Sequence, residues 1–238
     1  MTSRIEELAW QQTPMGEISL RRRIDPVVKT QVYEVKLGDE FLMSSMFTVA
    51  EIELARLGLA ELAGDELDVV VGGLGLGYTA VAALADERVR SLIVVETLGE
   101  VIAWHQQGLL PFATELTTDD RCRLLHGDFF ELTARPAGYD PDVPGRLVHA
   151  ILLDVDHSPR HLLHPRHASL YTVDGLRALA AHLHPGGVFG LWSNDPPDDE
   201  FTAVLGEVFA DVGAKVVTFD NPLQGRTSAN TVYLARRT

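Results

Sequence analysis

The first part of the chain alternates apolar and polar residues, as strands with one buried face do. The segments GEISLRR and QVYEVKL place apolar residues at every second position, which predicts half-buried strands. With a shorter third segment they predict a meander of strands at Gly16–Arg23, Gln31–Leu37 and Glu40–Met43. Turn signals at Asp25-Pro26 and Gly38-Asp39 separate these strands. A helix is expected next, over Thr48–Ala63, with Thr48 and Glu51 at the spacing of a capping box.

From Leu67 onward the pattern changes to continuous apolar runs that alternate with helical stretches. The apolar runs predict buried strands at Leu67–Val71, Ser91–Glu96, Arg123–Leu125, Ala150–Asp154, Gly187–Trp192, Lys215–Phe219 and Thr231–Ala235. Helices are expected at about Tyr78–Ala85, Leu98–Gln106, Thr172–His184 and Asp199–Val212. Uninterrupted apolar strands separated by helices indicate a parallel sheet that is covered on both faces.

The last two apolar runs follow each other through Asn221–Gly225 with no helix between them. This arrangement predicts an antiparallel hairpin at one edge of the sheet. We therefore expect an α/β protein of Rossmann-like architecture, with a mostly parallel seven-stranded sheet and a small N-terminal β extension. The expected division is a β meander over residues 1–47 and the α/β domain over residues 48–238.

Composition narrows the class of protein further. The chain has 238 residues, of which 46% are hydrophobic and 23% charged, an ordinary globular balance. Its apolar runs are too short to span a bilayer, and MTSRIEELAWQQ lacks the apolar core of a secretory signal. A lone cysteine, Cys122, fits a reducing compartment, so a cytoplasmic location is expected. The net charge of −14 disfavours nucleic acid and anionic membranes as partners and suits a cationic small molecule.

The strongest chemical signal is a glycine-rich loop between a strand and a helix. Val69–Val71 leads into Gly72-Gly73-Leu74-Gly75-Leu76-Gly77, and a helix follows. Such glycines let the backbone approach a ligand closely at a helix N-terminus. Glu96 ends the next strand about 20 residues further on, where an acid can accept both ribose hydroxyls.

The loop favours an adenosyl ligand over a dinucleotide. A dinucleotide fingerprint requires Gly or Ala where Tyr78 stands, whereas the alternating Gly73, Gly75 and Gly77 match binders of S-adenosylmethionine. After the third strand, Asp128 is a candidate for the adenine amino group and Phe129 for a ring contact. A plain loop turn at Gly127-Asp128 is the alternative.

Acidic residues at the end of the fourth strand are candidates for catalysis. Asp154 lies at the carboxyl edge, where ligands sit in open α/β sheets, and Asp156 and His157 follow it. Asp154 could attract an ammonium group and accept its proton as the nitrogen attacks. Candidates for the substrate pocket are Tyr171, Asn194 and Asp195, the last two in the loop Trp192-Ser193-Asn194-Asp195-Pro196-Pro197.

A cluster of histidines follows these acids, at His157, His161, His164 and His167. Histidine at spacings of three or four residues can bind metal. Pro159 and Pro165 interrupt any helix here, and no cysteine or carboxylate pair completes a ligand set. We therefore expect no metal site and interpret the stretch as a substrate-facing loop.

Taken together, these segments resemble the spermidine synthase-like aminopropyltransferases, within the class I S-adenosylmethionine-dependent methyltransferase superfamily. The N-terminal meander is similar to that family's small β domain, and Gly72–Gly77 falls on its glycine motif. The resemblance implies a ribose-binding role for Glu96 and an adenine-side role for Asp128. It also aligns Asp154-Val155-Asp156-His157-Ser158-Pro159 with the family's Asp-Ser-Ser-Asp-Pro, and Leu170–Phe189 with its Phe-Tyr helix and Pro-Gly-Gly turn. A homodimer is a further implication.

Two departures from the family's pattern bear on the reaction. The family carries an aspartate, understood to bind the amine of decarboxylated S-adenosylmethionine, where this chain has Gly75. Loss of that carboxylate weakens the contact with the decarboxylated donor and removes repulsion against the carboxylate of the intact donor. The family's His-Glu pair before the glycine motif is not evident near Glu51–Leu57.

The sequence therefore predicts an S-adenosylmethionine-dependent transferase that moves a methyl group to a small, amine-containing acceptor. One alternative is an aminopropyltransferase, a spermidine synthase making a polyamine from decarboxylated S-adenosylmethionine. A second is a nucleotide-binding module without catalysis that acts as a regulator. A dehydrogenase is disfavoured by Tyr78.

Overall fold

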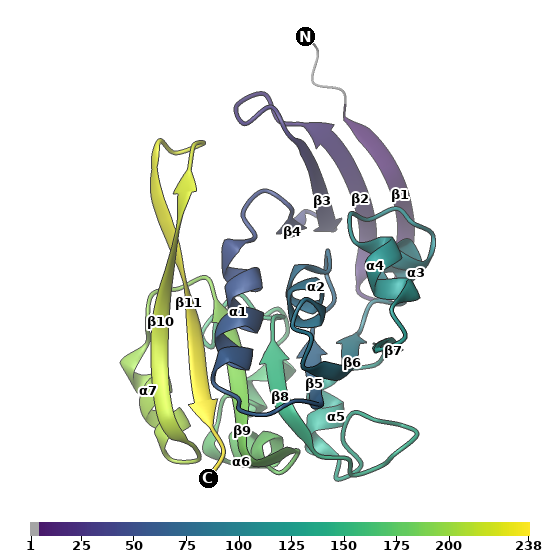
Figure 1. Cartoon of the computed structure of the whole chain (residues 1–238). Coiled ribbons are helices and arrows are strands. Elements are labelled where there is room, and N and C mark those ends of the chain that lie inside the picture. The colour runs from purple at the N-terminus through teal and green to yellow at the C-terminus, as the bar shows by residue number, and fades with distance from the viewer. Residues whose placement is uncertain (1–4) are drawn as a thin grey trace.

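The fold is built around a twisted seven-stranded sheet. A computed structural model describes residues 5–238 and orders the strands β10-β11-β9-β8-β5-β6-β7 (Figure 1). Their bounds are β5 Leu67–Gly72, β6 Val89–Glu96, β7 Cys122–His126, β8 Val148–Leu153, β9 Leu183–Ser193, β10 Ala210–Asn221 and β11 Arg226–Arg236. Strands β5 to β9 pair in parallel, and β11 joins β9 and β10 antiparallel. This sheet confirms the predicted fold class.

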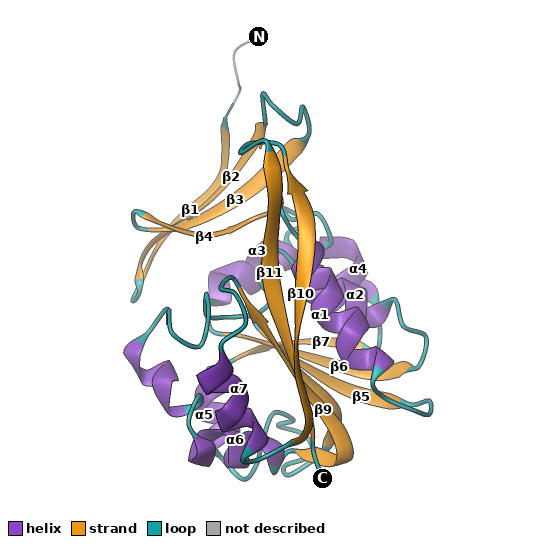
Figure 2. Cartoon of the chain, turned by 90° about the vertical axis from the view of Figure 1, so that its left-hand side faces the viewer, coloured by secondary structure: helices purple, strands orange, loops and turns teal. Residues whose placement is uncertain are grey.

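Helices cover both faces of the sheet and bury a separate core on each (Figure 2). On one face lie α1 (Val49–Ala60), α2 (Tyr78–Leu84), α3 (Gly99–Gln106) and α4 (Ala113–Thr118). On the other lie α5 (Phe129–Ala134), α6 (Val173–Ala180) and α7 (Asp199–Gly206), with a 3₁₀ turn, η1, at Pro165–Ser169. None of the helices within residues 5–238 is both long and apolar enough to cross a membrane.

A second, four-stranded antiparallel sheet precedes α1, in the order β1-β2-β3-β4. Its strands are β1 Glu6–Thr13, β2 Gly16–Ile24, β3 Gln31–Leu37 and β4 Glu40–Ser44. The sequence predicted the last three strands and missed β1. The first strand escaped notice because it lies at an edge and most of its residues are exposed and polar.

The chain forms shorter helices than the sequence predicted. The capping box expected at Thr48 is wrong: Thr48 is the N-cap of α1, but its side chain makes no capping hydrogen bond. The helix expected up to His184 ends at Ala180, and the one expected up to Val212 ends at Gly206. In both places the next strand begins earlier than predicted, because strand pairing competes with the last helical turn. The short helices α4 and α5 were not predicted.

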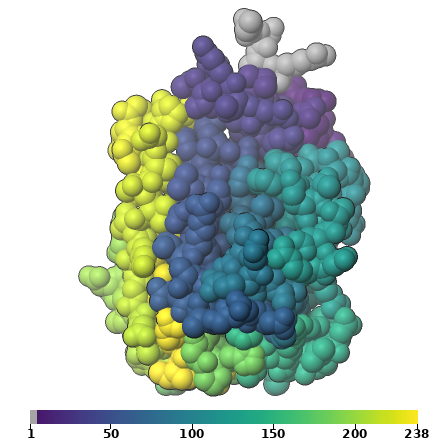
Figure 3. Space-filling view, viewed as in Figure 1, coloured from purple at the N-terminus to yellow at the C-terminus, as the bar shows by residue number. Residues whose placement is uncertain are grey.

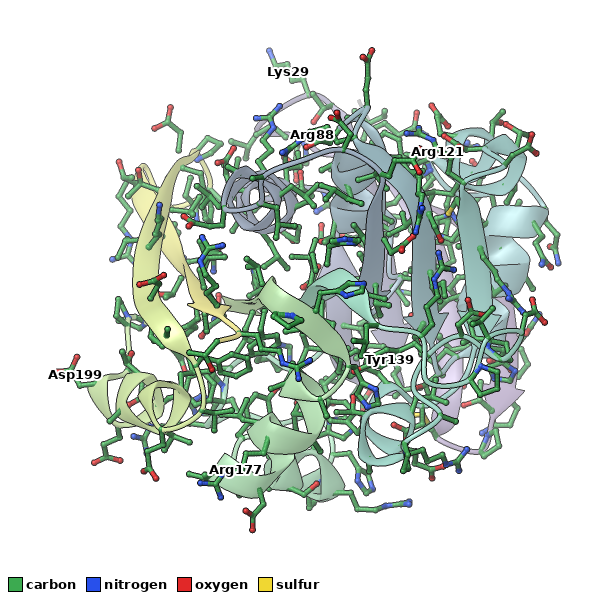
Figure 4. The ribbon with its side chains drawn as sticks, turned by 60° about the horizontal axis from the view of Figure 1, so that its bottom comes forward. Lys29, Arg88, Arg121, Tyr139, Arg177 and Asp199 are labelled. Atoms are coloured by element: carbon green, nitrogen blue, oxygen red, sulfur yellow. The ribbon has the colours of Figure 1, made fainter. Side chains whose placement is uncertain are left out.

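Two arginines close the turns between helices and strands by the same arrangement. Arg88 pairs with Asp86 and donates to the Leu59 and Leu62 carbonyls. Arg121 pairs with Asp119 and donates to the Leu84 and Val89 carbonyls, so each satisfies carbonyls at a chain turn. Figure 4 views the molecule from the end at which these two turns lie. Tyr139 lies in the interior in this view, and Arg177 and Asp199 lie at the margin.

The carboxyl end of the sheet carries the switch in strand order. From β5 the chain proceeds to β6 and β7 on one side and later to β8 and β9 on the other. Ligands of open α/β sheets bind at such a point. The long β10–β11 hairpin rises beside α1 toward the N-terminal sheet, as Figures 1 and 3 show. There Phe219 contacts Phe47 just before α1, with ring centroids 5.5 Å apart.

Packing of α1 on the sheet can be tested at Leu54, which is fully buried. We expect Leu54→Ala to lower the free energy of unfolding by about 2–5 kcal/mol, because it leaves a cavity between α1 and the sheet. Val49→Ala, in the exposed first turn of the same helix, should change it by less than about 0.5 kcal/mol. Urea unfolding followed by circular dichroism measures both, and equal losses would contradict the packing described here.

Candidate functional site

The glycine loop lies directly against the end of β8. Gly73 has φ +94°, and a Cβ placed on it would collide with the carbonyl oxygen of Asp154. The Asp154 amide in turn donates to the Gly72 carbonyl at 2.8 Å. A residue without a side chain is thus required here for the backbone contact that places Asp154 beside the loop.

Glu96 binds the glycine loop from the side of β6. Its carboxylate accepts hydrogen bonds from the amides of Leu98 at 2.8 Å, Leu74 at 3.1 Å and Gly75 at 3.4 Å. Only 8% of the residue is exposed. Burial raises its pKa, and these amide donors oppose the rise.

His105 of α3 binds the same loop from the opposite side, a contact that the sequence analysis missed. Its Nε2 lies 3.0 Å from the Gly75 carbonyl oxygen and is therefore the protonated nitrogen. Nδ1 is buried with no partner among residues 5–238. Burial lowers the pKa of His105, which keeps the ring neutral. An apolar helical pattern gave no signal for this role.

At Gly75 the loop meets the N-terminal sheet. Gly75 has φ +48°, and a Cβ there would lie 3.1 Å from the sulfur of Met43 in β4. A side chain at position 75 would thus contact the flexible thioether of Met43. The N-terminal sheet therefore contributes an apolar group at the position where the family that the sequence resembles carries an aspartate.

A pair of half-buried carboxyl groups lies beside the loop, formed by Asp154 and by Glu51 of α1, whose Oε2 is itself buried. Asp154 accepts a hydrogen bond from the Thr79 hydroxyl at 2.8 Å. Burial raises the pKa of Asp154 to about 6. Burial and the nearby Asp154 carboxylate raise the pKa of Glu51 to about 8. Perturbed carboxyl groups of this kind cluster at functional sites.

Glu51 was missed as a site residue because its position suggested only a helix cap. The fold instead brings the first turn of α1 over the ends of β8 and β9. The signal in the sequence was an acid in the first turn of the helix that precedes the glycine-loop strand.

Asp156 lies buried with both oxygens engaged. It accepts hydrogen bonds from the Leu163 amide at 2.7 Å, His167 Nδ1 at 2.8 Å and the Tyr171 hydroxyl at 2.9 Å. The His167 ring also stacks on Phe130, with centroids 3.7 Å apart. The structure thus joins two predicted site residues, Asp156 and Tyr171, in one network that folds the 156–171 segment.

The other residues predicted around the pocket lie in the loops above β8 and β9. His157 is half-buried, with Nε2 3.7 Å from Glu40 of β4. Asn194 accepts from the Asn230 side chain at 3.0 Å, and Asp195 lies 2.8 Å from His161 Nδ1. Asp195 lines a cavity of about 300 Å³, together with Tyr233. This cavity lies on the α7 side of the sheet, whereas Asp154 faces α1 and α2.

The two predicted adenine-side residues differ in how they are placed. Asp128 is the N-cap of α5 and accepts from the Phe130 and Glu131 amides through one oxygen. Phe129 is 2% exposed and stacks on Tyr139 inside the core. It lies against Gly72 from the far face of the sheet, so its ring does not face open space.

The four clustered histidines contact different partners. His164 accepts from the Arg166 amide, while His157, His161 and His167 lie near three separate carboxylates. Within residues 5–238 no group of three or more His, Cys, Asp or Glu side chains could hold a metal ion.

Comparison with known proteins establishes the fold. No protein-family model matches the chain, and no curated protein matches its sequence. Among solved structures, spermidine synthase from Thermotoga maritima superposes with a TM-score of 0.73 at 16% identity, covering 98% of this chain and 73% of that one. A spermidine synthase in complex with the transition state analogue AdoDATO gives 0.71 at 16% identity, covering 98% and 72%.

The human methyltransferase-like protein 13 in complex with SAH is a further similar structure. It gives a TM-score of 0.55 at 19% identity, covering 79% of this chain and 78% of that one. The chain therefore has the fold of the spermidine synthases and class I methyltransferases, which confirms the resemblance at the level of fold.

The contact at Gly73 predicts a large effect of a single methyl group. Gly73→Ala should destabilise the protein by about 1–3 kcal/mol more than Gly64→Ala, because of the overlap with the Asp154 carbonyl. Gly64 is the matched control, since it also has positive φ (+83°) but nothing within 4 Å of the added Cβ. Chemical unfolding measures both variants, and equal destabilisation would show that strain in φ alone matters.

Proposed function

We propose that the protein is an S-adenosylmethionine-dependent transferase that moves a methyl group to a small, amine-containing acceptor. The observation that carries this proposal is the half-buried Glu51–Asp154 carboxyl pair next to the glycine loop, with Asp154 hydrogen-bonded to Thr79. The raised pKa values mean that ionising both carboxyl groups at once is unfavourable. A cationic ligand next to the pair offsets this cost.

The donor site is formed by Gly73, Gly75, Gly77, Glu96 and Asp128. A structural neighbour binds SAH and another binds AdoDATO, which supports an adenosyl ligand for this fold. Each Glu96 oxygen keeps acceptor capacity beyond the loop amides, so the carboxylate can also accept ribose hydroxyls. Asp128 has one oxygen left for the adenine side. When bound, the sulfonium donor supplies an electrophilic carbon.

The acceptor site is formed by the carboxyl pair. Near neutral pH Asp154, with its pKa at about 6, is mostly ionised, whereas Glu51, at about 8, holds a proton. An entering ammonium group pairs with Asp154 and displaces the Glu51 proton. Asp154 then accepts a proton from the ammonium group, and the neutral amine that results would attack the methyl carbon of the donor, so that the N–C bond forms as the C–S bond breaks and S-adenosylhomocysteine leaves. Asp156 lies on the other side of the sheet and accepts three hydrogen bonds from its own loop, so we assign it to the folding of the loop and leave His157 at the rim.

Gly75 supports methyl transfer over aminopropyl transfer. With the Met43 thioether next to it, the loop offers no carboxylate for the amine of a decarboxylated donor at this position. Aminopropyl transfer with decarboxylated S-adenosylmethionine remains the second candidate, supported by the spermidine synthase fold. A non-catalytic regulatory module is the third.

We further propose a cytoplasmic homodimer that works on small molecules. The lone Cys122 supports a reducing compartment. Trp10 and Phe41, 51% and 46% exposed, share a face of the N-terminal sheet and support an interface there.

Calorimetric titration with the two donors tests the choice of reaction. We expect intact S-adenosylmethionine to bind more tightly than its decarboxylated form. Gly75→Asp should reverse the order, because the new carboxylate pairs with the amine and repels the carboxylate of the intact donor. Aspartate tolerates the positive φ, and Met43 can move aside. Tighter binding of the decarboxylated donor to the natural protein would make polyamine synthesis the function, and binding of neither would remove both enzymatic proposals.

Asp154→Asn tests catalysis separately from donor binding. We expect transfer to fall by about 10²-fold or more while the donor Kd stays unchanged, because the proton acceptor is lost. Asp174→Asn, at an exposed carboxylate in α6, is the control. The affinity of the natural protein for the acceptor should rise as pH rises from 6 to 8, since Asp154 and Glu51 ionise over that range. In Glu51→Gln the affinity should no longer rise in the upper part of this pH range, because only Asp154 still ionises. Full activity in Asp154→Asn would contradict this mechanism.

A further inference from the structure

Two buried polar atoms of opposite kind lack partners near the proposed acceptor site. They are Oε2 of Glu51, an acceptor when ionised, and Nε1–H of Trp192, a donor; neither has a hydrogen-bond partner within residues 5–238. Buried polar groups are nearly always satisfied in folded proteins. A ligand of this site is therefore expected to offer a hydrogen-bond donor to the Glu51 oxygen and an acceptor to the Trp192 indole N–H.

The two atoms belong to the same layer between α1 and the sheet. Leu54 of α1 packs over Gly190 of β9, since a Cβ on Gly190 would lie 3.0 Å from a Leu54 methyl group. Glu51 is one helical turn before Leu54, and Trp192 is two residues after Gly190, on the same face of β9. Both side chains thus lie just beyond the Leu54–Gly190 contact, toward the glycine loop.

Asp154 lies in this layer as well. Leu153 of β8 pairs with Leu191 of β9, so Asp154 and Trp192 are the next residues on neighbouring strands, which run about 4.8 Å apart. Both follow residues of the α7-side core and so face α1. The carboxyl pair and the indole N–H therefore border one small volume at the carboxyl end of β8 and β9.

An ammonium group alone does not satisfy this set of groups. It donates to the Glu51 and Asp154 oxygens but has no lone pair for the indole N–H of Trp192. A ligand that leaves a buried donor unpaired binds more weakly, because the donor has lost its hydrogen bond to water and gains none from the ligand. A site with such a donor therefore favours a ligand that carries an acceptor over one that lacks it. The ligand that fits carries an acceptor oxygen close to its amine.

The surroundings also distinguish a monoamine from a diamine. On the α1 side, Phe47 just before the helix and Phe219 of the β10–β11 hairpin contact each other, with ring centroids 5.5 Å apart. The carboxylates in the loops after β8 and β9 do not extend this site, because Asp156 and Asp195 lie on the α7 side of the sheet and are engaged by His167 and Tyr171 and by His161. They therefore offer no partner to the far end of a linear diamine bound in this layer.

We propose that the acceptor is an amine of the 1,2-amino alcohol type with an apolar remainder, and that Trp192 determines this specificity by donating its indole N–H to the acceptor's oxygen. The inference rests on the proposed amine-acceptor function. It assigns the amine to Glu51 and Asp154, the neighbouring oxygen to Trp192, and the apolar remainder to the side of Phe47 and Phe219.

Calorimetry on the full chain with saturating S-adenosylhomocysteine tests the assignment. The ligands are 2-amino-1-phenylethanol, the matched amine 2-phenylethylamine that lacks the hydroxyl, and 1,4-diaminobutane. We expect the amino alcohol to bind about tenfold more tightly than 2-phenylethylamine, the factor that one hydrogen bond contributes. In Trp192→Phe the ratio should fall to about one, while 2-phenylethylamine keeps its affinity.

The outcomes separate this inference from the function on which it rests. Equal binding of the two phenyl compounds to the natural protein would overturn it without any variant. An unchanged ratio in Trp192→Phe, or tightest binding of 1,4-diaminobutane, would also overturn it, and both leave the amine-acceptor function standing. Failure of all three amines to bind would remove the amine acceptor itself.

Discussion

The site depends on the backbone contact between the glycine loop and the first residue after β8. Because Gly73 has no side chain, the Asp154 carbonyl can approach it, and strands β5 and β8 end at the same level. Glu96 then holds the amide of Gly75 and His105 its carbonyl. The backbone of Gly75 is thus held by one strand, through Glu96 of β6, and by one helix, through His105 of α3. The loop is therefore formed before any ligand binds.

That contact also determines the electrostatics. It places Asp154 next to Thr79 and close to the first turn of α1, where one oxygen of Glu51 is buried with no hydrogen-bond partner among residues 5–238. A protein with a net charge of −14 already repels anions, and two carboxyl groups in a closed layer intensify this locally. A bound cation would relieve this repulsion, as the proposed amine acceptor does.

Much of this architecture could be predicted from the sequence, since period-two and continuous apolar patterns report directly on which faces are buried. The sheet, its edge hairpin and the glycine loop all follow from such local patterns. Glu51, His105 and Met43 could not be found in this way, because their roles arise from contacts between elements far apart in the chain. Proximity in sequence to Asp154 does not imply the same surroundings: Asp156 lies on the opposite side of the sheet and accepts three hydrogen bonds from its own loop.

The N-terminal sheet and the hairpin lie outside the parallel strands and yet reach the candidate site and the start of α1. Met43 of the first lies beside Gly75, and Phe219 of the second contacts Phe47 just before α1. Spermidine synthase from Thermotoga maritima superposes on 98% of this chain at 16% identity, so the shared fold includes the N-terminal sheet and the hairpin as well as the parallel strands. Side chains such as Met43 and Phe219 can therefore differ while the backbone arrangement is kept, because the ligand of a site depends on such side chains and not on the fold alone.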